Sequence, residues 1–284
     1  MEEEKKIPKP LESILLIIGS IFISLFLIQI GIFIFYQDPL ENIEEISRSK
    51  MILLFGEFSM ILLPFFYLKI KQYSLKDIFR WNPIDNRLIL TSIYLGIALS
   101  IVGDELDRII SVFIPPPDFL EDLAIMMKIN SSGDFIVLVV GVVIIAAIVE
   151  ESVFRGMLQM SLEKYSDVTK AVIYSSLVWT FIHGIIYWAI QIFLIGVVLG
   201  YLAWRTKSII PSAICHAINN ALALWQINSG ESESVYEWQG HVSPLFLIPA
   251  IVFLVIGVKY FADFYRRDTF SGSDTVDTDW GNSE

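Results

Sequence analysis

The chain has 284 residues, of which 55% are hydrophobic and 18% are charged. A soluble domain carries about 25% charged residues, so this composition excludes an ordinary soluble globule, and it also excludes a disordered chain. The net charge of −11 argues against a nucleic-acid partner, and the single cysteine, Cys215, excludes an internal disulfide. We therefore expect an integral membrane protein, provided that the hydrophobic residues form long runs.

The hydrophobic residues do form long runs. Residues 13–37 contain 25 positions without a charge and residues 184–204 contain 21, and both exceed the roughly 18 needed to span a bilayer. Eight hydrophobic segments can be marked, near residues 13–37, 51–68, 88–103, 135–160, 170–184, 186–204, 208–225 and 242–262. The sequence therefore predicts an all-α, polytopic membrane protein with about eight transmembrane helices around an intramembrane cavity.

The basic residues indicate how these helices are oriented. With the N-terminus inside, 15 of the 20 lysines and arginines lie on the inner side and four on the outer side, while Arg155 lies within a segment. Because inner loops carry the excess of positive charge, we expect a multi-pass protein of the plasma membrane with both termini in the cytoplasm. The expected organisation is a cytoplasmic N-terminus at 1–12, a helical membrane domain at 13–265 and a disordered cytoplasmic tail at 266–284.

A few polar side chains lie inside the hydrophobic segments. A membrane interior accepts ionisable groups only where they face the helix bundle or a wet cavity, so these residues are functional candidates. They are Glu57, Glu150, Glu151, Arg155, His183 and His216, with Asn219 and Asn220 as uncharged companions. Glu57 lies near the outer side of its segment, and we expect it to be an interhelical hydrogen-bond partner.

Helical spacing divides the candidates by role. Glu151 and Arg155 are four residues apart, share a helix face and should form an ion pair. Glu150 then points elsewhere without a local cation, which suits a general base. The competing interpretation is an ion-paired helix end near the inner interface, with both glutamates solvated.

The other candidates fall at a similar depth. At about 1.5 Å per residue from the inner-side charges, Glu150, His183 and Asn220 lie roughly 20 Å deep and His216 roughly 13 Å. Two pairs, Trp179 with His183 and His216 with Asn220, each share a helix face. Cys215 points about 100° away from His216, so it is a packing residue rather than a nucleophile. One middle layer therefore holds a carboxylate, two imidazoles and a carboxamide.

This set of groups can hydrolyse a peptide bond without a covalent nucleophile. A carboxylate with an imidazole can deprotonate a water molecule, and a second imidazole with an amide can stabilise an oxyanion. A zinc version is equally open, in which Glu150, His183 and His216 bind the ion and leave one position for water.

The three motifs resemble a known family. Glu150-Glu151-x-x-x-Arg155, Trp179-x-x-x-His183 and His216-x-x-x-Asn220 are similar to the motifs of the CAAX protease and bacteriocin-processing (CPBP, also called ABI) intramembrane proteases. The resemblance covers roughly residues 135–225, and the family includes the Ras-converting CAAX prenyl endopeptidases. The second motif usually begins with Phe, so Trp179 is a departure that keeps an aromatic ring.

The resemblance implies a role for each residue. Glu150 and His183 would activate the hydrolytic water, and His216 and Asn220 would stabilise the oxyanion. Glu151, Arg155 and Trp179 would support the site. The expected activity is intramembrane endopeptidase cleavage of membrane-associated proteins or peptides. Prenylated CAAX-like tails, bacteriocin or signalling peptides and other membrane proteins are all open as substrates, and both metallo and metal-free glutamate mechanisms are argued for this family.

Two other functions remain open from the sequence. In a proton- or ion-coupled transporter, Glu150, His183 and His216 would form a relay, although no internal repeat is visible. In a non-catalytic immunity or scaffold membrane protein, the fold would persist without chemistry, although the complete polar set argues against this.

Overall fold

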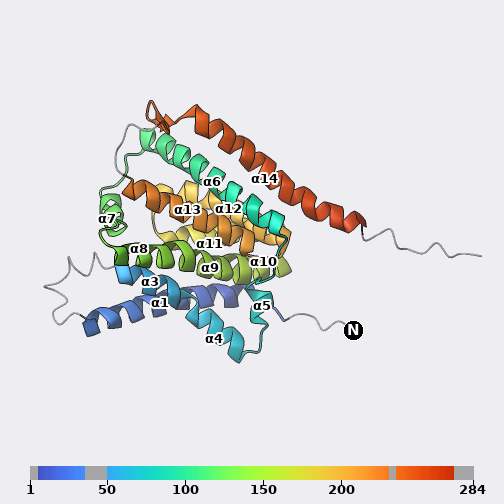
Figure 1. Ribbon diagram of the computed structural model, residues 1–284. Helices are drawn as coiled ribbons and strands as arrows, with labels where there is room; N and C mark the ends of the chain where they lie inside the picture. The colour runs from blue at the N-terminus through green and yellow to red at the C-terminus, as the bar shows by residue number, and fades with distance from the viewer. Residues whose placement is uncertain (1–5, 36–49, 230–234, 272–284) are drawn as a thin grey trace, which may run out of the picture.

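The fold is a bundle of helices around one long central helix (Figure 1). The computed structural model describes residues 6–35, 50–229 and 235–271. Its helices are α1 (Pro10–Phe35), α3 (Lys50–Met60), α4 (Leu62–Ile70), α5 (Leu75–Ile78), α6 (Asn86–Phe113), α7 (Phe119–Met126), α8 (Ser132–Leu138), η1 (Val139–Ile145), α9 (Ala146–Glu150), η2 (Glu151–Leu158), α10 (Gln159–Tyr165), α11 (Val168–His183), η3 (Ile186–Trp188), α12 (Ala189–Thr206), α13 (Ile210–Asn228) and α14 (Pro244–Ser271). A short hairpin with two residues in each strand, β1 (Glu237–Trp238) and β2 (His241–Val242), precedes α14. Apart from this hairpin the described elements are helices, which confirms the expected all-α class.

The central helix runs without a break from α8 to α10, over Ser132–Tyr165. Its start is capped by Ser131, whose hydroxyl accepts a hydrogen bond from the Asp134 amide. Two of its stretches, η1 and η2, are wound as π-helix. Such wider turns occur frequently at functional sites. The second of them carries the Glu151-x-x-x-Arg155 motif.

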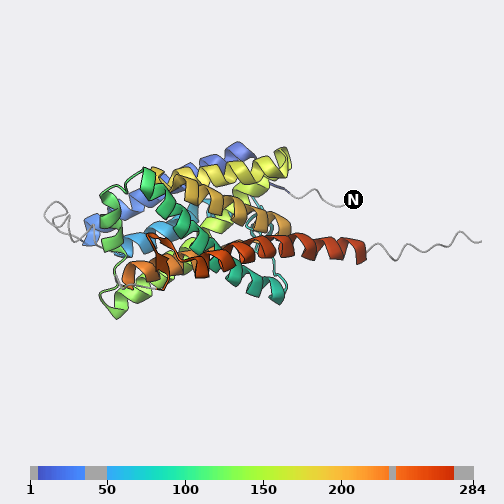
Figure 2. The same ribbon diagram turned by 90° about the horizontal axis from the view of Figure 1, so that it is seen from above.

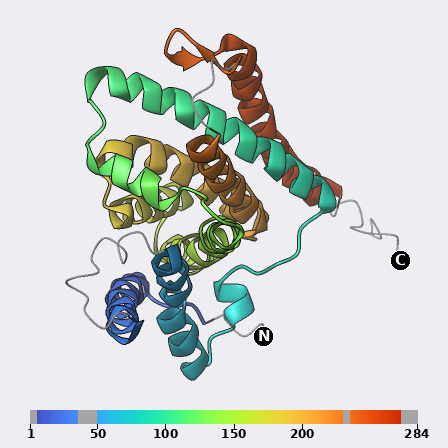
Figure 3. The same cartoon turned by 60° about the vertical axis from the view of Figure 1, so that its left-hand side comes forward.

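The other helices form layers on either side of the central helix. Helices α1, α3 and α4 lie on one side of the central helix, and α6 and α14 lie on the other. Helices α11 to α13 lie between the central helix and α6 (Figures 1 and 3). Helix α6 packs against both α13 and α14, whereas α11 packs against α12. Viewed from above, α14 extends past the other helices at one end (Figure 2). The central helix is thus enclosed by neighbours on several faces.

Among the described residues, six helical stretches are long and apolar enough to span a membrane. They are Pro10–Ile34, Lys50–Ile70, Asn86–Phe113, Ser132–Tyr165, Ile186–Thr206 and Pro244–Phe264. The other two predicted segments are also helical, but α11 has only 16 residues and α13 carries His216, Asn219 and Asn220. A polytopic helical membrane protein is supported, while a total of eight crossings stays a prediction.

Two predicted boundaries differ from the structure or fall outside it. Helix α14 continues to Ser271, past residue 265, where the helical domain was expected to end. The remainder of the expected tail, 272–284, lies outside the described residues, as do positions 36–37 of the first hydrophobic segment. The helix outlasts the hydrophobic run because polar residues also sustain helical backbone once a helix has started.

A glycine on the central helix lets the linker after α5 lie directly against it. A Cβ added at Gly156 would fall 2.7 Å from the Phe79 Cα and 2.9 Å from the Phe79 carbonyl oxygen. Next to this contact, Arg80 donates a hydrogen bond to the Arg155 carbonyl at 3.2 Å. Trp81 donates one to the Ser152 hydroxyl at 2.9 Å. The linker is therefore fixed to the segment that carries the first motif.

We predict that Gly156→Ala lowers the free energy of unfolding by about 1–3 kcal/mol, because its methyl group must push backbone away from backbone. Gly31→Ala is the matched control, since a Cβ there meets nothing within 4 Å. The measurement is thermal unfolding of the purified protein in detergent. Equal stability of the two variants would contradict the close approach.

Candidate active site

The three predicted motifs meet around the side chain of Trp179 on α11. The Trp179 ring lies edge-on to the rings of His183, at 4.8 Å, and His216, at 5.4 Å. The Arg155 guanidinium carbon lies 4.1 Å from the centre of the same ring. The indole N–H donates a hydrogen bond to the Glu150 carboxylate. Helices far apart in sequence, namely the central helix, α11 and α13, are thus joined at one aromatic side chain.

The second part of the site is a buried charge cluster. Oε1 of Glu151 accepts a hydrogen bond from Nη1 of Arg155 at 2.8 Å and lies 3.1 Å from Nδ1 of His216. Glu151 and Arg155 are 0% exposed and His216 is 4% exposed. The predicted pairing of Glu151 with Arg155 is therefore present. The competing interpretation, a helix end with both glutamates solvated, is wrong.

The cluster depends on a close approach by α12. The Gly196 carbonyl accepts a hydrogen bond from Nη2 of Arg155 at 3.4 Å. A Cβ at this glycine would fall 3.1 Å from the Trp179 ring, tighter than ordinary contact. Within the described part of the chain, Oε2 of Glu151 and Nε of Arg155 are buried without a hydrogen-bond partner. Such orphaned atoms are rare in folded proteins and mark where a water or a substrate can be bound.

Glu150 is less isolated than its spacing predicted. It is 8% exposed, it accepts the Trp179 N–H, and it lies within electrostatic range of the Arg155 guanidinium and of both imidazole rings. The expectation that it lacks a nearby cation is therefore corrected. Arg155 lies on the next turn and reaches Glu150 as well as Glu151, because a buried charge acts over several ångströms in a low-dielectric interior.

Glu57 on α3 is a site residue that sequence reasoning placed elsewhere. Its carboxyl group lies beside the carboxyl group of Glu150 and interacts with it electrostatically. Two carboxyl groups can hydrogen-bond only if one of them holds a proton. The expected role as an interhelical hydrogen-bond partner stays a prediction, and the residue beside Glu57 is the central glutamate. A single acid in a hydrophobic segment was the available signal.

The hydrogen bonds of His183 identify which ring nitrogen carries its proton. Its Nδ1 lies 2.8 Å from the Trp179 carbonyl oxygen. A carbonyl oxygen only accepts, so Nδ1 donates, and Nε2 holds the lone pair that can accept a hydrogen bond from water. For His216, Nδ1 faces the Glu151 carboxylate in the same sense. Each imidazole is thereby oriented through its Nδ1 side.

Asn220 lies one helical turn from His216, and one N–H of its amide is already used in a hydrogen bond. Its Nδ2 donates to the Val142 carbonyl on η1 at 2.9 Å, and the side chain is half-buried. A second N–H on the same nitrogen remains for another acceptor. Cys215 is buried and its thiol contacts the Ser92 carbonyl at 3.1 Å, as expected for a packing residue.

The side-chain geometry does not fit the zinc site considered from the sequence. Within the described ranges, no three His, Cys, Asp or Glu side chains converge closely enough to hold a metal ion. One oxygen of Glu150 is already engaged by the Trp179 N–H, which competes with a metal ligand role beside His183 and His216. No catalytic step is therefore derived through a metal.

Comparison with known proteins supports the family resemblance that the three motifs predicted. Residues 132–222 match the family model described as "Type II CAAX prenyl endopeptidase Rce1-like". The matched part contains all seven motif residues, from Glu150 to Asn220. The resemblance to CAAX proteases is thereby confirmed for this part of the chain, and it indicates a protease. No curated protein and no solved structure was found to match the chain.

We predict that Trp179→Phe lowers the free energy of unfolding by about 1.5–3 kcal/mol, because the buried Glu150 carboxylate loses its N–H donor while the ring is kept. Trp225→Phe on α13 is the control, since this tryptophan is 63% exposed. Both variants are compared by thermal unfolding in detergent. An equal, small effect at the two positions would show that the indole N–H is dispensable.

Proposed function

We propose that the protein is an intramembrane endopeptidase that hydrolyses peptide bonds of membrane-associated proteins or peptides with a water activated by Glu150 and His183. The observation that carries this proposal is the buried Glu150 carboxylate, held by Trp179 and acted on by both imidazoles. It lies in the part of the chain that matches the CAAX prenyl endopeptidase family.

In the first step, a water bound between Glu150 and His183 attacks the carbonyl carbon of the scissile peptide bond. Its proton passes to the Glu150 carboxylate, and Nε2 of His183 orients the water by accepting a hydrogen bond. The new C–O bond forms as the carbonyl π bond opens, and a tetrahedral oxyanion results. The bond from His183 Nδ1 to the Trp179 carbonyl supports this orientation.

In the second step, His216 and Asn220 stabilise the oxyanion. When the His216 ring is protonated, its Nδ1 remains on Glu151 and its Nε2 offers an N–H to the oxyanion. The second amide N–H of Asn220 is the other donor, and one donor of this kind is worth about 10²–10³ in rate. Glu150 then gives its proton to the leaving nitrogen, the C–N bond breaks, and a carboxylic acid and an amine form. The acid passes its proton to the amine, so a carboxylate and an ammonium group are released and Glu150 is again ionised.

The scheme also assigns a proton to Glu57. Glu57 lies beside Glu150, and the scheme needs Glu57 to be protonated while Glu150 is ionised before water attack, because two adjacent carboxylates repel one another. Glu150 is the ionised partner because the Trp179 N–H and the Arg155 charge both favour its carboxylate. The base is thus available for the first step without a change in its surroundings.

The substrate class and the topology follow from the family match and the charge distribution. The matched family is described by prenyl endopeptidase activity, so we propose prenylated, CAAX-like C-terminal segments as substrates. The excess of basic residues on one side supports cytoplasmic termini in the plasma membrane. The partners are then the lipid bilayer and a protein or peptide substrate.

We predict that Glu150→Gln and His183→Ala each reduce cleavage of a farnesylated CAAX-like peptide by about 10²–10⁴-fold, because each removes a group that moves or orients the reacting proton. Activity is measured with purified protein in nanodiscs, with and without a strong chelator, and the wild type should keep its rate in the chelator.

Two variants outside the site serve as matched controls. Glu121→Gln changes an exposed acid on α7, and His241→Ala changes the remaining histidine, which contacts Glu105 in the hairpin region. Both should retain full activity. Wild-type cleavage by a well-folded Glu150→Gln variant would refute the endopeptidase proposal, and loss of wild-type activity with chelator would refute the metal-free scheme.

A further inference from the structure

A large polar hollow lies at one end of the bundle, apart from the candidate active site. Its volume is about 950 Å³, and it is lined by the segment before α1, the residues from the end of α4 to the start of α6, helix α10, and the turn between α12 and α13. None of the seven motif residues lines it. Its residue Glu163 on the central helix comes 13 positions after Glu150, which is roughly 20 Å along the helix axis.

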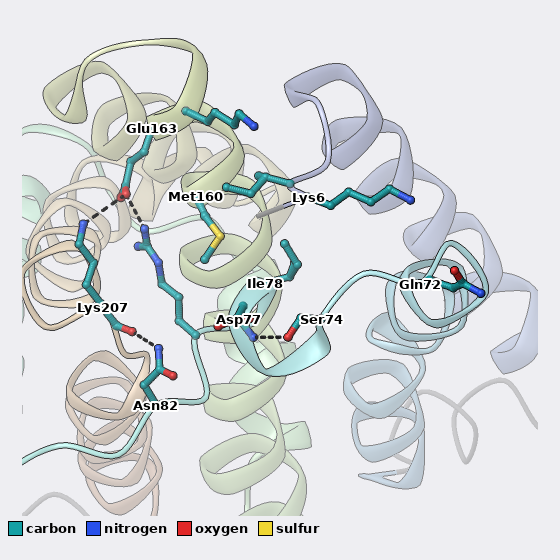
Figure 4. Close-up of a pocket in the computed structure, with 12 residues that line it drawn as sticks. Lys6, Gln72, Ser74, Asp77, Ile78, Asn82, Met160, Glu163 and Lys207 are labelled. Atoms are coloured by element: carbon teal, nitrogen blue, oxygen red, sulfur yellow. Dashed lines mark hydrogen bonds and ion pairs between the residues drawn. The ribbon is translucent and has the colours of Figure 1, made fainter. Parts of the chain in front are cut away.

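The hollow carries an excess of positive charge. Among the described residues that line it, four are basic and two are acidic, namely Lys6, Arg80, Lys164 and Lys207 against Asp77 and Glu163. Figure 4 shows Lys207 and Glu163 on one side of the hollow and Lys6 on the other. The Glu163 carboxylate pairs with Arg80 and also lies 3.8 Å from the Lys207 ammonium. One carboxylate therefore faces two cations.

The environment of Lys207 reflects this imbalance. Partial burial lowers the pKa of its ammonium group, Glu163 opposes the shift, and the charges of Arg80 and Arg205 add to it. The Lys207 carbonyl is held by the Asn82 side chain at 2.6 Å, which fixes the turn beside the hollow. An additional anion in the hollow would favour the charged ammonium form.

Arg80 supplies a buried donor that is only partly used. The side chain is 2% exposed, and Nη1 donates to the Arg155 carbonyl while Nη2 donates to Glu163. Its Nε has no hydrogen-bond partner among the described residues. A buried guanidinium N–H without an acceptor is costly, and a ligand oxygen would satisfy it.

The backbone around the hollow is also unusual. Gln72, Arg80 and Lys207 have φ values of 59°, 52° and 53°, in the left-handed region that residues other than glycine rarely adopt. They are three of the four such non-glycine residues in the described ranges. Helices commonly end with a left-handed residue, and Lys207 is such a residue at the end of α12. The clustering of the three residues around the hollow is independent of the charge count.

The hollow lies at the depth of lipid headgroups. Four lining residues lie one to four positions outside the ends of candidate membrane spans: Lys6 before Pro10, Gln72 after Ile70, Asn82 before Asn86 and Lys207 after Thr206. The hydrocarbon core ends where these spans end, and the phosphates of phospholipids lie just beyond it. Basic pockets between helices at this level bind anionic headgroups.

We propose that this hollow is a binding site for a phosphate group, held by Arg80 and Lys207. Their guanidinium and ammonium groups form charge-assisted hydrogen bonds with phosphate oxygens, while Lys6, bonded to the Lys71 carbonyl on the opposite side, adds positive charge at longer range. The phosphate comes either from an anionic phospholipid or from a soluble phosphate compound. The proposal does not depend on the peptidase activity.

The experiment compares two double variants of the full chain with the wild type. Lys6→Gln with Lys207→Gln removes two cations from the hollow. Lys69→Gln with Lys76→Gln removes two exposed lysines nearby that do not line it. Native mass spectrometry measures retention of dioleoylphosphatidylglycerol against dioleoylphosphatidylcholine, both supplied equally. Thermal unfolding with inorganic phosphate or with chloride at equal ionic strength tests the soluble source.

The wild type and the Lys69/Lys76 variant should prefer the anionic lipid, and the Lys6/Lys207 variant should lose that preference by about tenfold. If inorganic phosphate stabilises the wild type but not the Lys6/Lys207 variant, and no lipid is preferred, the site takes a soluble phosphate compound. Equal losses in the two double variants would overturn the proposal, as would unchanged binding of lipid and phosphate in the Lys6/Lys207 variant. A cooperative thermal unfolding transition of both double variants, within a few degrees of the wild type in chloride, verifies that they are folded.

Discussion

The buried ion pair between Glu151 and Arg155 is the interaction on which the rest of the site depends. Both side chains are fully buried in a helix that passes through the centre of the bundle. Desolvating two such ions costs several kcal/mol each, and removing one partner of a buried pair costs about 3–5 kcal/mol. The surrounding helices must therefore supply further partners. His216 on α13 and the Gly196 carbonyl on α12 do so, which fixes both helices around the first motif.

Trp179 connects the buried ion pair to the groups that are the candidates for catalysis. Its ring lies under the Arg155 guanidinium, while its N–H holds the Glu150 carboxylate and its backbone carbonyl holds His183. The ring that packs against the buried cation thus positions both the base and the imidazole beside it. Through Trp179, the ion pair therefore also helps to position Glu150 and His183, which are not members of the pair. Preorganised groups of this kind lose little free energy to reorganisation during catalysis.

Much of the site could be predicted because few polar residues occur inside the hydrophobic segments, and such residues must face one another. The all-α class followed from the length of the hydrophobic runs, and the Glu151–Arg155 pair followed from its four-residue spacing. Sequence spacing gives distance along a helix but neither its tilt nor the rotation of its neighbours. For that reason the contact of Glu57 with Glu150 and the cation near Glu150 were missed. The N–H donor role of Trp179 was hidden because the ring was read only as a packing surface.

The basic residues near the headgroup level illustrate a limit of the same kind. As a count, they indicated only which side of the membrane is positive. In the folded chain, Lys6, Arg80, Lys164 and Lys207 come from four separate segments and line one hollow. Arg80 also contacts the Arg155 carbonyl, on the turn that carries the first motif. Arg80, which the sequence counted only among the basic residues of the expected inner side, therefore also joins the hollow to the helix of the candidate active site, and only the three-dimensional contact reveals this role.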